Sequence, residues 1–359
     1  MASAIEFLAR IYRFFFPPTV PKDNDALKIG ILGAAKIAPY SIIYPSRSHS
    51  GVVIEGWARA SAFAKKHGIP RVFKNYQDLL NDPSIDIVYN PFEWTMKALE
   101  AGKHVLLEKP SGNTAEETIK MFEFAQEKNL VLLEAFHYRF HPAIQTVKNL
   151  VDSGVIGKIT GADAEMAVPN IFSKDDIRYQ YELGGGATMD LGYRPNRHLH
   201  DARVDRSLRA IFDMSNDVTS SIYCDFSMPK RSILGPLPFF RWLPRLPTFT
   251  VNVLGDEGEI HINNFLVPTV YHSITITKGK ETETIKAYTG EKLPDAPKGE
   301  AWWSTYRWQL EAFVDKVKNR TPQTWVTPED SVANMKVIDE LYDASGLGKR
   351  PASSYLQQY

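Results

Sequence analysis

Short apolar runs alternate with helical patterns in the first part of the chain. An apolar run at 28–32 is followed by four further predicted strands, at 52–57, 85–89, 104–108 and 130–134. Between them, the spacing of apolar residues predicts helices at 61–67, 76–80, 93–101 and 114–128. Strands that alternate with helices form a parallel sheet with helices on both faces. We therefore predict a doubly wound α/β domain over residues 28–143.

The pattern changes after residue 144. A helix is predicted at 147–153, and the later strands alternate apolar with polar residues, at 159–168, 218–226, 249–254, 259–263 and 274–277. Asp256-Glu-Gly258 has the composition of a hairpin turn. Two closing helices are predicted at 302–320 and 328–344. These elements predict a C-terminal α+β domain over residues 144–345, built on an open, mostly antiparallel sheet, with a tail at 346–359.

The first apolar run ends in closely spaced small residues. Gly30, Gly33 and Ala35 precede Lys36, where a helix is expected to begin. Small residues in a strand–helix turn let backbone N–H groups approach an anion, and the helix N-terminus adds further donors. We predict the phosphate-binding turn of a Rossmann-type dinucleotide domain. A tight turn without a ligand has the same composition and is the alternative.

Arg59 follows the second predicted strand, where a dinucleotide fold meets the adenosine ribose. An acid at this point accepts a hydrogen bond from the 2′-hydroxyl, whereas an arginine suits a 2′-phosphate. Arg59 thus favours NADP over NAD, with an ordinary surface arginine as the alternative. The neighbouring strands end near Asn90, Lys109 and His137, which are expected to converge on the same crevice.

Composition narrows the range of functions. Among 359 residues, 42 Lys and Arg balance 42 Asp and Glu, so no net charge favours nucleic acid. The single cysteine, Cys224, excludes an internal disulfide and fits a reducing, cytoplasmic location.

The N-terminal segment 5–16 is apolar but is interrupted by charges and is too short to span a bilayer. We predict an amphipathic helix that belongs to an N-terminal arm, residues 1–27, and packs on the first domain. Peripheral membrane contact is the alternative.

Four stretches share a more specific arrangement. They are Ile29-Gly-Ile-Leu-Gly-Ala-Ala35, the segment 94–110 that ends in Glu108-Lys-Pro110, Glu134-Ala-Phe-His-Tyr-Arg-Phe-His-Pro142, and Gly184-Gly-Gly-Ala-Thr-Met-Asp-Leu-Gly192. Together they resemble the Gfo/Idh/MocA oxidoreductases, especially the fungal D-xylose 1-dehydrogenase and dihydrodiol dehydrogenase branch. The resemblance implies a nicotinamide-binding Rossmann domain and an open-sheet domain whose exposed face builds a homodimer.

The resemblance also implies residue roles. Lys109 reaches the substrate oxygen, while Asp190 and a nearby tyrosine complete the acid–base set; the alternative is a solvated lysine at a strand end. Tyr193 is the candidate base, because a lysine cation lowers the pKa of a phenol from its ordinary value of about 10. The candidate cofactor contacts are Gly30, Gly33, Ala35, Lys36, Arg59, Asn90, Glu108 and Lys109.

His137 and Asp176 are candidate substrate contacts. His137 is expected to face the crevice, and the carboxylate of Asp176 suits the vicinal hydroxyls of a sugar, with a solvated loop charge as the alternative. The histidines have no carboxylate at a recognisable ligand spacing, so no metal site is predicted.

The chain is shorter than the family pattern near residues 60, 91 and 193, all in the predicted cofactor and substrate cleft. Phe92-Glu-Trp94 follows Asn90-Pro91 at once, and Tyr193 stands one position early. Two explanations stay open: coding segments are missing from the sequence, or the protein has diverged toward weak or non-redox function.

The leading hypothesis is an NADP-dependent dehydrogenase. It transfers a hydride between the nicotinamide and a sugar or small cyclic alcohol, with oxidation of a D-xylose-like aldose to a lactone as the first candidate reaction. A tailoring oxidoreductase of a biosynthetic pathway and a non-catalytic binding or scaffold relative are the alternatives.

Overall fold

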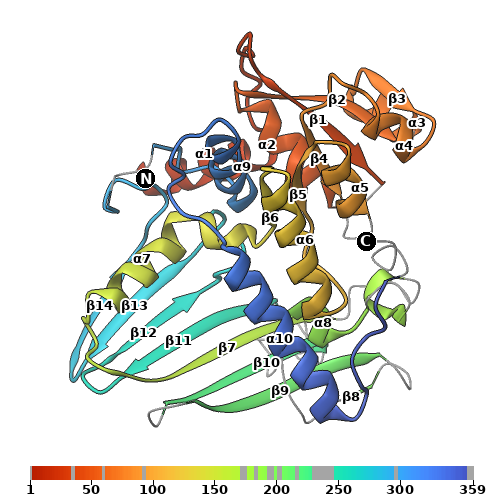
Figure 1. The fold of residues 1–359 in the computed structure, drawn as a ribbon. Coiled ribbons are helices and arrows are strands. Elements are labelled where there is room, and N and C mark those ends of the chain that lie inside the picture. Colours follow the sequence, from red (N-terminus) through yellow and green to blue (C-terminus); the bar gives the residue numbers. More distant parts are fainter. Residues whose placement is uncertain are drawn as a thin grey trace, which may run out of the picture.

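Two sheets organise the molecule (Figure 1). The computed structural model describes residues 2–33, 37–58, 61–90, 94–169, 176–181, 185–191, 198–199, 204–214, 218–228, 246–294 and 298–353. The first sheet has the strand order β3-β2-β1-β4-β5-β6 and is parallel throughout. Its strands are β1 (Leu27–Leu32), β2 (Val52–Ala58), β3 (Arg71–Phe73), β4 (Ile87–Asn90), β5 (His104–Leu107) and β6 (Leu132–Glu134). The predicted parallel sheet is confirmed.

Helices cover both faces of this sheet. One face carries a short helix at Pro39–Ile43, α2 (Tyr44–Arg47), α3 (Ser61–His67) and α9 (Thr305–Val317). The other carries α4 (Tyr76–Leu80), α5 (Thr95–Glu100) and α6 (Ala115–Glu127). Because apolar side chains meet helices on both sides, all four residues of β4 are buried, which explains the continuous apolar runs in the sequence. Although α9 comes from the C-terminal part of the chain, it contributes Trp308 and Phe313 to this core.

The second sheet has the order β14-β13-β12-β11-β7-β10-β9-β8. Its strands are β7 (Ile159–Pro169), β8 (His198–Leu199), β9 (Asp205–Met214), β10 (Val218–Met228), β11 (Thr248–Gly255), β12 (Glu259–Asn263), β13 (Ser273–Lys278) and β14 (Glu281–Ile285). Neighbours are antiparallel except β7 and β10. This confirms the predicted, mostly antiparallel sheet, and residues 256–258 connect β11 to β12 as expected.

Helices α7, α8 and α10 connect the second sheet to the first. α7 (Pro142–Asp152) lies on one end of the sheet, where Ile144 and Val147 pack against residues such as Ile260 and Ile274. α10 (Pro328–Ser345) crosses the other end and joins α6 to α8 (Ala187–Leu191), as Figure 1 shows. α7 begins five residues before the predicted start, because Pro142 occupies its first turn and does not interrupt it.

The N-terminal helix α1 (Ala2–Phe15) confirms the predicted amphipathic helix. The arm contacts the first domain as expected, because the Val20 amide donates to the Arg47 carbonyl at 3.0 Å and Lys22 Nζ donates to the Ser46 carbonyl at 2.6 Å. The helix also has a second anchor. Arg10 Nε donates to the carbonyl of Thr269 at 3.0 Å, and its guanidinium lies 3.7 Å from the ring centroid of Tyr288. The segment that follows β12 and the segment that follows β14 therefore both hold the helix, in addition to the first domain. Within the described part of the chain, no helix combines the length and apolarity needed to cross a membrane.

Candidate active site

The glycine turn follows β1 at the carboxyl edge of the first sheet. Gly33 has a φ of +83°, and a Cβ at this position would lie 3.3 Å from the hydroxyl of Tyr76. A side chain would be strained there, so glycine suits the turn. Gly30 has a different role, because a Cβ there would come within 2.6 Å of Leu79 on α4. Ala35 and Lys36 lie outside the described residues.

The ends of β4 and β5 are joined by polar contacts. The Glu108 amide donates to the Asn90 carbonyl at 3.0 Å, and Asn90 Nδ2 donates to the Thr95 hydroxyl at 3.1 Å. The Tyr89 hydroxyl donates to the Glu108 carboxylate and lies 2.7 Å from the Ser41 hydroxyl. Burial, and then the Glu108 charge, raise the pKa of Tyr89. Tyr89 therefore keeps its proton and orients Glu108 at the crevice.

Lys109 follows β5 and precedes a cis peptide bond to Pro110. The next amide, that of Ser111, donates to Glu134 Oε1 at 2.7 Å. Burial raises the pKa of Glu134 to about 7, and the nearby positive charge of Lys109 opposes this shift. Glu134 thus ties the segment after Lys109 to the end of β6 and responds to the lysine charge. The sequence showed Glu134 at a strand end but gave no reason to assign it a role.

His137 lies just beyond β6, in a short 3-10 turn, His137–Phe140. Its Nδ1 is 2.8 Å from the Thr305 hydroxyl, and its ring lies 3.9 Å, centroid to centroid, from that of Tyr306. Burial, and then the charge of Lys109, lower the pKa of His137 to about 3. The imidazole is therefore neutral at pH 7. Leu107 pairs with Glu134 across β5 and β6, so Lys109, Glu134 and His137 lie at or just beyond the ends of neighbouring strands, and we call these three residues the Lys109 cluster.

Of the remaining catalytic and substrate candidates, Asp176 makes its described contacts elsewhere. Asp176 pairs with Arg178 Nη1 at 3.0 Å and accepts a hydrogen bond from the Arg178 amide. Its carboxylate therefore stabilises the turn in which it lies. Asp190 lies in α8, but its side chain is not described. Arg59 and Tyr193 lie outside the described residues.

The described histidines have structural partners. His141 accepts from the Ala143 amide at 3.1 Å and caps α7, while His272 Nδ1 lies 2.7 Å from the Pro268 carbonyl. Within the described ranges, no three His, Cys, Asp or Glu side chains are grouped so that they could hold a metal ion.

The arrangement fits a nicotinamide dinucleotide. A glycine turn with positive φ ends β1, a helix follows it, and polar residues gather at the ends of β4, β5 and β6. Open parallel sheets bind dinucleotides at this edge, with the pyrophosphate at the helix N-terminus. Asn90, Glu108 and Lys109 lie at the ends of β4 and β5 on this edge.

Comparison with known families decides the assignment. Residues 27–136 match the oxidoreductase family with an NAD-binding Rossmann fold, and residues 144–195 match the Gfo/Idh/MocA C-terminal domain. An uncharacterized oxidoreductase of Rhizobium meliloti is 33% identical, over 90% of this chain and 98% of that protein. The chain belongs to the Gfo/Idh/MocA oxidoreductase family. The resemblance seen in the sequence is confirmed, and members of this family are NAD(P)-dependent dehydrogenases and reductases.

Two relatives of this Gfo/Idh/MocA protein have stated activities. D-xylose 1-dehydrogenase (NADP(+)) 2 of Haloferax volcanii is 28% identical, over 90% of this chain and 98% of that protein. A 3-ketoreductase from Actinomadura kijaniata, solved with NADP and TDP-benzene, has a TM-score of 0.72 at 24% identity. That comparison covers 89% of this chain and 97% of the other. The structural likeness extends over both sheets and supports the fold.

Proposed function

We propose that the protein is an NADP-dependent oxidoreductase that transfers a hydride between the nicotinamide and a carbinol carbon of a sugar or small cyclic alcohol. The observation that carries this proposal is the placement of Lys109, Glu134 and His137 at the ends of β5 and β6, on the edge of a sheet that fits a dinucleotide. Oxidation of a D-xylose-like aldose to its lactone is the first reaction to test, because an NADP-dependent xylose dehydrogenase is among the relatives.

Each described residue of the cluster has a distinct task. NADP, when bound at this edge, would supply the hydride acceptor in the oxidation direction. Lys109 donates a hydrogen bond to the substrate hydroxyl oxygen and stabilises the negative charge that develops as the C–H bond breaks. Because His137 is neutral, Lys109 is the cation of the cluster. Glu134 holds the backbone that follows Lys109 through the Ser111 amide. Tyr193 is the proposed base for the hydroxyl proton, with Asp190 as its partner.

Cofactor binding is the first test. Purified protein is titrated with NADPH and with NADH while nicotinamide fluorescence is followed. We expect micromolar binding of NADPH and at least tenfold weaker binding of NADH, because Arg59 suits the 2′-phosphate. In Arg59→Asp this order reverses. Binding of neither nucleotide would support the non-catalytic alternative and overturn the proposal.

Lys109→Met tests the catalytic role. We expect kcat to fall by a factor of about 10²–10⁴, the range for loss of a proton-handling or charge-stabilising group. NADPH binding should change less, because the glycine turn is untouched. Lys128→Met, at an exposed position after α6, is the matched control and should keep full activity. Unchanged kcat in Lys109→Met would remove Lys109 from the mechanism.

We also infer a homodimer formed through the open face of the second sheet. A row of side chains crosses this face from Thr284 through Thr275, His261, Asn252, Asp163 and Ser221 to Ile211. His261 Nδ1 lies 2.6 Å from Asn252 Oδ1, and Ser221 donates to Asp163. Ile211, at the end of the row, is 63% exposed. An ordered polar surface with an exposed apolar end suits a symmetric interface.

A further inference from the structure

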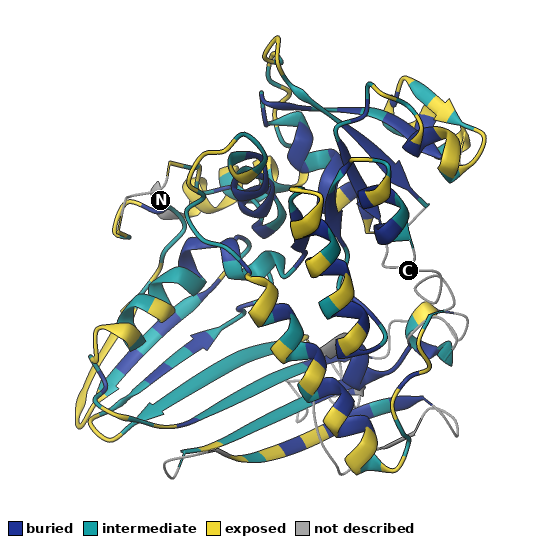
Figure 2. Ribbon diagram, viewed as in Figure 1, coloured by how far each residue is buried: buried dark blue, intermediate teal, exposed yellow. Residues whose placement is uncertain are grey.

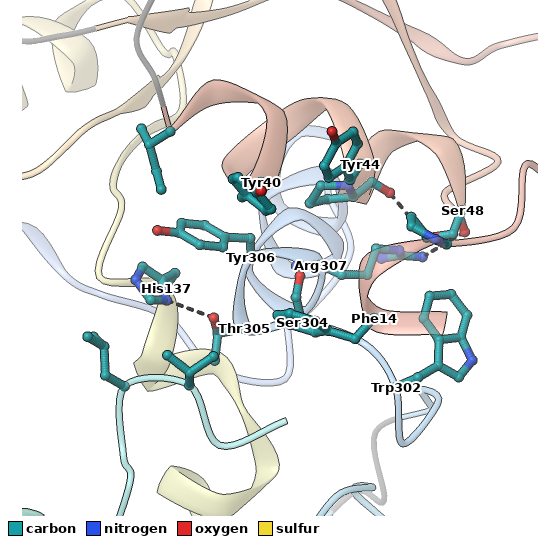
Figure 3. Close-up of a pocket in the computed structure, with 15 residues that line it drawn as sticks. Phe14, Tyr40, Tyr44, Ser48, His137, Trp302, Ser304, Thr305, Tyr306 and Arg307 are labelled. Carbon is teal, nitrogen blue, oxygen red and sulfur yellow. Dashed lines mark hydrogen bonds between the residues drawn. The ribbon is translucent and has the colours of Figure 1, made fainter. Parts of the chain in front are cut away.

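An apolar cavity opens beside the Lys109 cluster. Its volume is about 310 Å³, and Figure 3 shows its walls. They come from five segments: the end of α1 with Pro17, the helical stretch 37–48, His137, residues 266–267, and residues 302–307 at the start of α9. His137 and Tyr306 lie toward one end in Figure 3, and Ser48 and Trp302 toward the other. No segment forms this cavity alone.

His137, Ser48 and Arg307 on the walls have partners within the protein, whereas the buried Trp302 Nε1 and Arg307 Nε have no hydrogen-bond partner among the described residues. His137 pairs with the Thr305 hydroxyl, and the Ser48 hydroxyl donates to the Pro45 carbonyl at 3.2 Å. Arg307 Nη1 donates to Glu311 at 2.6 Å, and its guanidinium lies 3.8 Å from the ring centroid of Trp303. A ligand with many polar groups would lose water there and gain few hydrogen bonds. The cavity therefore favours an apolar occupant held by aromatic walls.

The cavity borders the candidate active site at His137. His137 forms part of its wall and also feels the charge of Lys109. Ile37, directly after the glycine turn region, forms another part and is 39% exposed. An apolar group in the cavity would thus be attached to a molecule whose polar part lies at Lys109. The volume is about twice that of a cavity of about 150 Å³ that binds benzene, so one or two rings fit.

We propose that this cavity binds an aromatic or alicyclic substituent of the substrate. The substrate class is then a sugar or cyclic alcohol that carries such a substituent, not a small free sugar. This inference rests on the proposed oxidoreductase function, because that function places the reacting carbinol at Lys109. α1 takes part directly, since Phe14 closes one side of the cavity.

The test compares D-xylose with 4-O-benzyl-D-xylose, which keeps the C1 hydroxyl free for oxidation. Binding of each sugar is measured by isothermal titration calorimetry in the presence of saturating NADPH, which cannot accept a hydride, and turnover with NADP is measured separately. We expect the benzyl ether to bind at least about tenfold more tightly and with a more negative heat-capacity change, because its ring leaves water. Equal affinity for the two sugars would overturn the proposal.

Two variants fill the cavity and one serves as control. Val267→Phe and Ser48→Leu add volume from different walls, and each should remove most of the advantage of the benzyl ether. Val72→Phe adds the same group on β3, where Val72 is 47% exposed, and should keep the full advantage. Thermal unfolding shows which variants are folded. Retention of the advantage in both folded cavity variants would contradict the assignment.

The two proposals fail in different ways. If the benzyl ether binds more tightly and Val267→Phe abolishes this, but neither sugar is oxidised, the cavity stands and the proposed reaction is wrong. If both sugars are oxidised with the same kcat/KM and bind equally, the reaction stands and the apolar substrate class is wrong.

Discussion

The two sheets bury their strands in different ways. In the first sheet, all four residues of β4 are buried, whereas β12 and β13 in the second sheet alternate buried with half-buried positions. Figure 2 shows long half-buried stretches along the strands of the second sheet. A sheet covered on both faces can place chemistry only at its strand ends, where Lys109 and His137 lie. A sheet with an open face can present a surface to a partner.

The difference in burial predicts different losses of stability when a side chain is removed from each sheet. Ile31→Ala in β1 should lower the free energy of unfolding by about 2–5 kcal/mol, because Ile31 is fully buried and leaves a cavity. Ile211→Ala in β9 should change it by less than about 0.5 kcal/mol, since Ile211 is exposed in the monomer. Urea unfolding at a protein concentration that keeps the chain monomeric measures both. Equal losses would show that the open face is covered within the monomer.

The second prediction concerns the buried carboxyl at the end of β6. Burial raises the pKa of Glu134 from 4.5 to about 7, so the folded state keeps a proton that the unfolded state releases in this range. The free energy of unfolding should therefore fall by about 3 kcal/mol as the pH rises from 4.5 to above 7. Glu134→Gln keeps an acceptor for the Ser111 amide and removes the titration.

Urea unfolding of both proteins at pH 5 and pH 8 isolates this effect, because all other groups titrate alike in the two. The variant should gain stability relative to the native protein as the pH rises. A constant difference between the two proteins would mean that Glu134 has an ordinary pKa.

The same contrast explains how much of the fold the sequence could predict. Strands of the first sheet are continuous apolar runs, and five of its six strands were predicted. In the second sheet, the sequence pattern does not predict β9, because Arg206, Arg209 and Asp213 interrupt its alternation. It does not predict β14 either, because all residues of this strand except the last are exposed. An alternating pattern depends on one face only, so charges on the open face hide it.

The site was predictable where it follows from topology. Strand ends of a parallel sheet meet at one edge, so the convergence of Lys109 and His137 could be expected from their positions in the chain. The role of Glu134 depends on a hydrogen bond that it accepts from the Ser111 amide of another segment, and the apolar cavity depends on five segments. Neither leaves a local signal in the sequence.

A charge placed on the open face of the second sheet should have the smallest effect on the folded monomer. Asn252 lies in the middle of the open face, opposite His261 on one side and Asp163 on the other. Asn252→Arg places a charge there that would meet a like charge, or be buried without a partner, across a two-fold interface. We expect sedimentation velocity to show a dimer for the native protein and a monomer for the variant. The free energy of unfolding of the monomer should change by less than about 0.5 kcal/mol, because the face is open to water.

Thr282→Arg, on the exposed edge strand β14, adds the same charge away from the centre and should leave the dimer intact. A native protein that is monomeric at all concentrations, or an Asn252→Arg variant that still dimerises, would assign the open face to something other than a second copy.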